Sequence, residues 1–267
     1  MKSMTFLQTI DHIGRTIEEN LHSRSDFSRL VSSELKKYSL PELFHEKLLP
    51  ELRKRHEEME PLKGRSCHFS DECFILFIGT GYSIELYHWD YRDTAIHDHD
   101  FLGAFQCLKG LNHQMQFQYV SGNFIFNGME NGELKPLGSR KVFPGEIEII
   151  QDEDKFIHVV SHETSTFNLC IRTNTDGSKP LRVYHIDGIR YVIPMNNDRL
   201  EKLEKDKDYP IQDFSSEELL FAFHNHPLAQ KKLAGKRLAE KHGIDFLKSQ
   251  QETWAFLNKL SETAKGY

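Results

Sequence analysis

The chain has 267 residues, of which 38% are hydrophobic, 28% charged and 11% aromatic, and its net charge is -6. This length allows one domain with a sizeable core and additions, and the acidic balance argues against a nucleic-acid partner. The first residues lack the apolar run of a signal peptide, and no run of about 18 apolar residues predicts a membrane span. The four cysteines form no CxxC pair, so we expect free thiols in a reduced, cytoplasmic protein.

Residues 1–64 are predicted to form helices. In the first helix the apolar residues recur at the spacing of one helix face, at Phe6, Ile10, Ile13 and Ile17. A second helix is expected to begin at Ser25 or Asp26, and a third to run from Pro41 to His56. These helices are expected to pack on the core that follows them.

Residues 65–195 are predicted to be a β-domain, because short apolar or alternating runs such as CFILFIG and TFNLCIRT are separated by turn signals such as GTG, SGN and FPGE. Closely spaced short strands indicate a sandwich or barrel. Within 113–120 glutamines alternate with Met115, Phe117 and Tyr119, which predicts one polar and one apolar strand face. Helical spacing returns over 196–267, so the fold class is mainly β with flanking helices at both ends.

The sharpest functional signal is Ala95-Ile96-His97-Asp98-His99, close to apolar strands. Residues two apart on a strand face the same side, so His97 and His99 project together, about 6–7 Å apart along the strand. Two neutral imidazoles in this arrangement can bind one metal ion. The alternative is a surface or hydrogen-bonded pair, since an HxH sequence is by itself a weak signal.

A third ligand is expected at His158, in the run Phe156-Ile157-His158-Val159-Val160. The alternative is a buried histidine that is hydrogen-bonded to a neighbour. His162 shares the strand face of His158 and competes for the ligand position. It could instead lie behind the ligands and orient one of them.

The order of HxH, an apolar strand, a Pro-Gly pair (Pro144-Gly145) and a distal histidine resembles the two motifs of the cupin superfamily. The resemblance implies a cupin-type barrel, also called a double-stranded β-helix or jelly roll, with a metal site. Most metal cupins add a glutamate four or five residues after the second histidine. Gly103 and Ala104 stand there, which argues against the four-ligand cupins.

A metal site of three histidines without glutamate is similar to that of the thiol dioxygenases, cysteine dioxygenase in particular. In the register of that family, three residues of the strand after the third ligand would face the barrel interior, namely Asn168, Cys170 and Arg172. Phe167, Leu169 and Ile171 would then pack against the flanking helices, and Arg172 would be an anion clamp. The alternative puts the three apolar residues inside and Arg172 in solvent. The tyrosine and the early arginine of that family have no match here, so the substrate does not follow from the resemblance.

The sequence therefore predicts a mononuclear non-haem iron oxygenase, an Fe(II)-dependent dioxygenase-like oxidoreductase with metal ligands His97, His99 and His158. Arg172 and His162 are the expected catalytic residues, and the partners are O₂ and a small polar substrate such as a thiol or an amino acid derivative. Zinc, nickel and manganese fit the ligands as well. The alternatives are a non-oxidative metal-dependent lyase or isomerase and a cupin without enzymatic activity. Cupins often pair through strands, so a homodimer is a further expectation.

Overall fold

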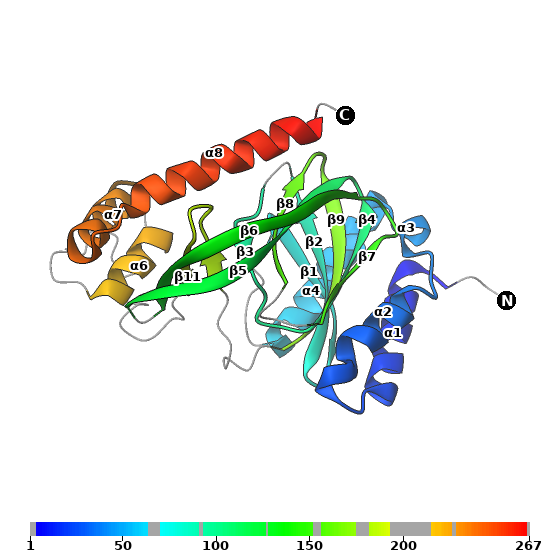
Figure 1. Ribbon diagram of the computed structural model, residues 1–267. Helices are drawn as coiled ribbons and strands as arrows, with labels where there is room; N and C mark the ends of the chain where they lie inside the picture. The colour runs from blue at the N-terminus through cyan, green and yellow to red at the C-terminus, as the bar shows by residue number, and fades with distance from the viewer. Residues whose placement is uncertain are drawn as a thin grey trace.

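The computed structural model describes residues 4–63, 70–90, 93–126, 128–151, 156–174, 182–192, 215–225 and 228–265. Helices come first, then a β-core, then helices again (Figure 1). The fold class is mainly β with helices at both ends, as predicted, and the β-core contains a closed barrel. The predicted segment boundaries at 64/65 and 195/196 lie outside the described residues.

The N-terminal helices are α1 (Phe6–Asn20), α2 (Phe27–Leu35), α3 (Leu40–Leu43) and α4 (Leu49–Lys63), with 3-10 turns at Arg24–Asp26 and Glu46–Leu48. Thr5 caps α1 in a capping box with Gln8. The predicted third helix is wrong as a single element, because it is divided into α3 and α4. Phe44 is extended and buried at the end of α3, and Pro50 stands at the start of α4, where a missing N–H costs least.

The strands are β1 (Glu72–Gly79), β2 (Tyr82–Trp89), β3 (Ile96–His97), β4 (Gly103–Lys109), β5 (Asn112–Phe126), β6 (Met129–Val142), β7 (Ile147–Ile150), β8 (Ile157–His162), β9 (Thr166–Thr173), β10 (Arg182–Tyr184) and β11 (Ile189–Val192). One sheet has the order β1-β2-β9-β4-β7, and the other closes as a barrel in the order β10-β11-β6-β5-β8-β3. Every pairing is antiparallel.

The hairpin of β5 and β6 is longer than the sequence predicted. We expected a turn at Ser121-Gly122-Asn123, but β5 continues through it and the register shifts between Val120 and Asn123. The extra residues form a β-bulge. A side chain at Gly122 would lie 2.0 Å from the carbonyl oxygen of Asn131 on β6, so only glycine fits this close approach.

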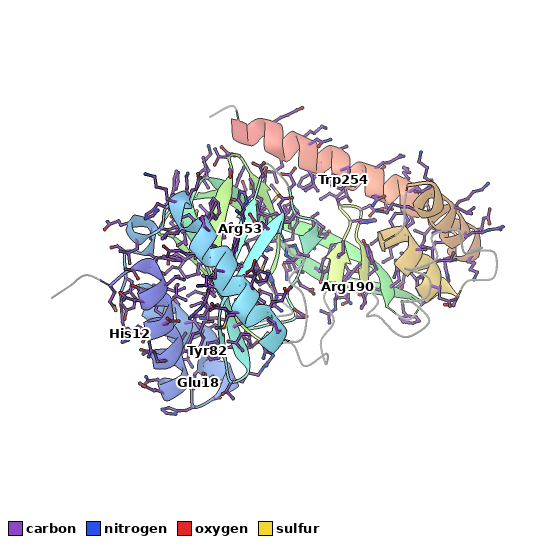
Figure 2. The ribbon with its side chains drawn as sticks, turned by 180° about the vertical axis from the view of Figure 1, so that it is seen from behind. His12, Glu18, Arg53, Tyr82, Arg190 and Trp254 are labelled. Carbon is purple, nitrogen blue, oxygen red and sulfur yellow. The ribbon has the colours of Figure 1, made fainter. Side chains whose placement is uncertain are left out.

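The N-terminal helices cover the outer face of the five-stranded sheet, where α1 and α4 lie against β1 (Figure 2). Tyr82 of β2 fixes α1 by donating a hydrogen bond of 2.5 Å to the carbonyl oxygen of Gly14. The residues of β9 that the sequence assigned to this face belong to the same core cluster as the helices, namely Phe167, Leu169 and Ile171. Strand β9 therefore has the register that the family resemblance implied, and not the alternative that puts these three residues inside the barrel.

The C-terminal helices are α6 (Ser216–Asn225), α7 (Leu228–His242) and α8 (Phe246–Lys265). Figure 1 shows α8 running along the barrel, with α6 and α7 beside one end of the β5–β6 hairpin. Leu257 and Leu260 of α8 pack with Phe117 and Val159 of the barrel. Among the described residues, no helix combines the length and apolar character that crossing a bilayer requires.

The cysteines match the prediction of free thiols only in part. Cys107 and Cys170 are buried free thiols, as predicted, but Cys73 is disulfide-bonded, so the prediction of free thiols is wrong for Cys73. Disulfides are typical of oxidising compartments. The cytoplasmic location stays a prediction.

Candidate metal centre and pocket

Three histidines meet inside the barrel, and we call His97, His99 and His158 the histidine trio. His97 of β3 pairs directly with His158 of β8 in the antiparallel register, so their side chains are cross-strand neighbours on one face. His99 follows β3 two residues after His97. One nitrogen from each imidazole lies within 4.8 Å of the others, and all three residues are buried. The sequence predicted these three residues, and the structure brings them together.

Hydrogen bonds fix the orientation of two members of the trio. Nδ1 of His97 lies 2.8 Å from the carbonyl oxygen of Ala95. Because a carbonyl only accepts, Nδ1 carries the proton and Nε2 is the unprotonated nitrogen of this ring. Nδ1 of His158 lies 2.8 Å from the side-chain amide of Gln114 on β5. These contacts are of the kind that hold metal-binding imidazoles in place.

Burial keeps the trio uncharged. It lowers the pKa of His97 and, together with the neighbouring imidazoles, lowers the pKa of His99 and of His158 well below the ordinary value. Three neutral imidazoles are therefore present at neutral pH, and neutral imidazole is the form that binds metal ions.

The nitrogens of the trio fit a metal ion. Nε2 of His99 and Nε2 of His158 lie 3.1 Å apart. Two imidazoles bound to one ion at about 2.1 Å hold their nitrogens about 3.0–3.4 Å apart. The amide oxygen of Gln114 is buried without a partner in the described structure. Reversing this amide would let the oxygen accept from Nδ1 of His158 and would leave Nε2 of that ring free to bind.

The absence of a glutamate after the HxH motif has a structural reason. A side chain at Gly103 would begin 2.1 Å from the carbonyl oxygen of Ile171 on β9, so no carboxylate can stand there. Ala104 belongs to the core under the N-terminal helices and faces away from the trio. Neither position can supply a metal ligand.

Asp98 points away from the trio and fixes the HxH segment. Its carboxylate accepts hydrogen bonds from the backbone and side chain of Arg182 at 2.8 and 3.1 Å, and from Tyr184 at 2.9 Å. Both partners lie on β10, which pairs with β3. Burial raises the pKa of Asp98 to about 6, although these hydrogen bonds lower it. Asp98 thus anchors the short strand that carries His97.

A pocket of about 80 Å³ adjoins the trio between the two sheets. Much of its wall is apolar or aromatic, formed by Tyr87, Trp89, Phe101, Phe105, Val142 and Val160. Its polar lining comes from Thr94, Asn112, Gln114, Glu148, His162 and Asn168. Glu148 is paired with Arg140. In the part of the chain that the structure describes, no lysine or arginine lines this pocket.

His162 lies at the pocket wall and outside the trio. Its ring stacks on Trp89 with centroids 4.8 Å apart, and its Nδ1 lies 2.7 Å from Asn112 and 2.7 Å from Thr166. Burial lowers the pKa of His162 to about 3. The sequence left two roles open for His162, a metal ligand or a residue that orients a ligand. The structure places His162 beside the pocket and outside the metal-binding group.

Arg172 is buried on the inner face of β9, as the predicted register requires, with its guanidinium 4.5 Å from the ring centre of Phe101. Its Nε lies 4.0 Å from the carboxylate of Glu85, which also accepts hydrogen bonds from Ser83 and Tyr87. Phe101 and Tyr87 line the pocket, whereas Arg172 does not. Its role as an anion clamp stays a prediction.

Sequence reasoning missed Gln114, Asn112 and Trp89 as parts of the site. The alternation of β5 does show that Gln114 and Phe117 face opposite sides, and the structure puts Gln114 in the pocket and Phe117 in the core under α8. Which side faced the histidines depended on the pairing of β5 with β8, and a single sequence does not reveal strand pairing.

No protein-family model matches the chain, and the comparison with curated proteins finds no match. Among solved structures, a cupin superfamily protein from Desulfitobacterium hafniense is 11% identical over 42% of this chain and 87% of that chain, with a TM-score of 0.27. A hydroquinone 1,2-dioxygenase from Sphingomonas sp. TTNP3 is 11% identical over 42% and 70%, with a TM-score of 0.31. A DMSP lyase from Ruegeria pomeroyi is 13% identical over 41% and 49%, with a TM-score of 0.28. TM-scores of this size do not indicate which activity this chain has.

Proposed function

We propose that this chain is a mononuclear metal-dependent oxygenase of the cupin type, in which His97, His99 and His158 hold Fe(II) beside the substrate pocket. The observation that supports this best is the trio itself, three buried neutral imidazoles whose nitrogens lie within 4.8 Å of one another. Three nitrogen ligands on one side of an ion leave positions open for O₂ and substrate. Bound Fe(II) supplies the redox chemistry that O₂ requires.

The residues of the chain have separate tasks in this proposal. Ala95 and Gln114 hold the rings of His97 and His158. Asp98 anchors the HxH segment to β10. The aromatic wall excludes water from the pocket beside the trio, and exclusion of water prevents side reactions.

Oxygen consumption tests the proposal. Protein loaded with Fe(II) is expected to consume O₂ in the presence of a substrate from a panel of phenols, thiols and amino acids, and protein loaded with Zn²⁺ is not. His158→Ala should abolish the consumption, whereas His113→Ala, which changes a β5 histidine outside the pocket, should retain it. Turnover that Zn²⁺, Ni²⁺ or Mn²⁺ supports without O₂ would favour the lyase or isomerase alternative instead.

A further inference from the structure

The pocket has two ends. The histidine trio lies at one end, and His162 with Asn112 and Asn168 lies at the other. His158 and His162 are four residues apart on β8, which separates their backbones by about 13 Å. Val160 lies between them and also lines the pocket. A bound molecule can therefore lie beside the trio and reach His162.

The walls between the two ends favour a flat apolar molecule. Phe105 lies close to His99, Phe101 and Tyr87, with ring centres 5.8, 6.1 and 6.1 Å apart. Aromatic rings at such separations leave flat faces and edges to which another ring can pack. Among the described residues that line the pocket there is no lysine or arginine, so an anionic group buried among the aromatic walls, away from the histidine trio, would have no side-chain cation as a partner and is strongly disfavoured.

His162 supplies a hydrogen-bond acceptor at the far end. The amide nitrogen of Asn112 donates to Asn168 at 3.1 Å, so the amide oxygen of Asn112 faces Nδ1 of His162 at 2.7 Å. Nδ1 therefore carries the ring proton, and Nε2 keeps a lone pair. Nε2 is buried and has no partner within the described structure, in a residue only 5% exposed. A ligand that donates a proton satisfies this atom, and a carboxylate does not.

The size of the pocket limits the ligand. A cavity of about 80 Å³ has roughly the volume of three water molecules at about 30 Å³ each, and it is smaller than the cavity of about 150 Å³ that holds benzene. The pocket therefore excludes ligands larger than a single ring.

We infer that the pocket binds a single-ring phenol, with the ring among the aromatic walls and the hydroxyl donating a hydrogen bond to Nε2 of His162. The inference rests on the proposed function in one respect, since the phenol is then the substrate of the metal centre. It replaces the small polar thiol or amino acid derivative that the sequence predicted. Trp89, stacked on His162, holds the acceptor ring in place.

Tryptophan fluorescence tests the inference directly. The chain has two tryptophans, Trp89 in the pocket wall and Trp254 on α8, which is 52% exposed. In the Trp254→Phe protein, Trp89 is the only remaining indole. Titration with phenol is expected to change its fluorescence saturably, whereas benzoate and L-cysteine should give no saturable change. Benzoate or L-cysteine binding at least as tightly as phenol would overturn the inference.

A second comparison of variants tests whether His162 is the hydrogen-bond acceptor for the phenol hydroxyl. In the same background, His162→Phe keeps a stacking ring and removes Nε2, and phenol affinity should fall about tenfold for the loss of one buried hydrogen bond. His113→Phe makes the same change outside the pocket and should leave phenol affinity unchanged. An equal loss in both variants contradicts the role of His162. The comparison of phenol with benzoate needs no change in the pocket, so it stands even if His162→Phe does not fold.

Metal analysis of the same samples separates the two proposals. A sample that holds iron but binds no phenol overturns the phenol inference and leaves the metal centre intact. A sample that binds phenol but takes up no metal supports the pocket and contradicts the proposed oxygenase.

Discussion

Gln114 is the residue whose effect on the metal centre can be isolated most cleanly. It contacts Nδ1 of His158 and binds no metal itself. Loss of such an outer contact typically lowers metal affinity about 10–100-fold. We therefore expect Gln114→Leu to weaken metal binding by this factor in a competition titration with a chelator.

The control lies on the same strand. Gln118 is exposed on β5, so Gln118→Leu should leave metal affinity unchanged. Gln114→Glu keeps an acceptor for Nδ1 and should retain most of the affinity. If Gln114→Leu binds metal as tightly as the unchanged protein, the amide has no orienting role.

The carboxylate of Asp98 connects the segment of β3 to β10 through its hydrogen bonds to Arg182 and Tyr184. Asp98→Ala leaves the buried hydroxyl of Tyr184 and the charged Arg182 without their partner. We expect a loss of about 2–4 kcal/mol in the free energy of unfolding, measured by urea denaturation. Glu133→Ala removes an exposed pair with Lys135 and should change stability by less than about 1 kcal/mol. Similar losses in the two variants would show that Asp98 is no anchor.

At the scale of elements, α1 depends on its buried face. Ile13 is fully buried between this helix and the five-stranded sheet. Ile13→Ala should lower the free energy of unfolding by about 2–5 kcal/mol, because it removes buried methyl groups and leaves a cavity. Leu233→Ala changes an apolar residue of α7 that is 42% exposed and should have an effect below about 1 kcal/mol. A small effect at Ile13 would mean that α1 does not contribute to the core.

Hydrophobic spacing explains which elements the sequence could predict. Helix α1 and strand β9 each bury one apolar face, so their apolar residues recur at a regular spacing in the sequence. The sequence of β6 shows no such spacing, because most residues of this strand are exposed. Pairing with β5 and β11 holds the strand in place. The trio could be predicted because His97 and His99 are two residues apart. Gln114 and Asn112 could not, because their place depends on which strands pair.

At the scale of the whole molecule, His185 connects the barrel to the C-terminal helices. Its ring packs on Tyr191 of β11 and Phe246 of α8, with centroids 5.6 and 5.0 Å apart. Burial lowers the pKa of His185 to about 4. An unfolded histidine takes up its proton near pH 6.5, so between about pH 6.5 and pH 4 the unfolded state binds more protons than the folded state. The folded state therefore loses stability as the pH falls through this window.

The expected loss from His185 is at most about 3 kcal/mol across the window. Urea denaturation at several pH values measures it. In His185→Phe the free energy of unfolding should depend less steeply on pH, whereas His12→Phe, a change on the exposed face of α1, should keep the original slope. An unchanged slope in His185→Phe would show that this histidine does not carry the effect.

The metal content of the purified protein tests the central claim most directly. Elemental analysis after reconstitution with Fe(II) should find one metal ion per chain in the unchanged protein and in His113→Ala. It should find none in the double variant His97→Ala, His99→Ala. Metal that stays bound in the folded double variant, or that never binds the unchanged protein, would contradict a metal centre at the histidine trio.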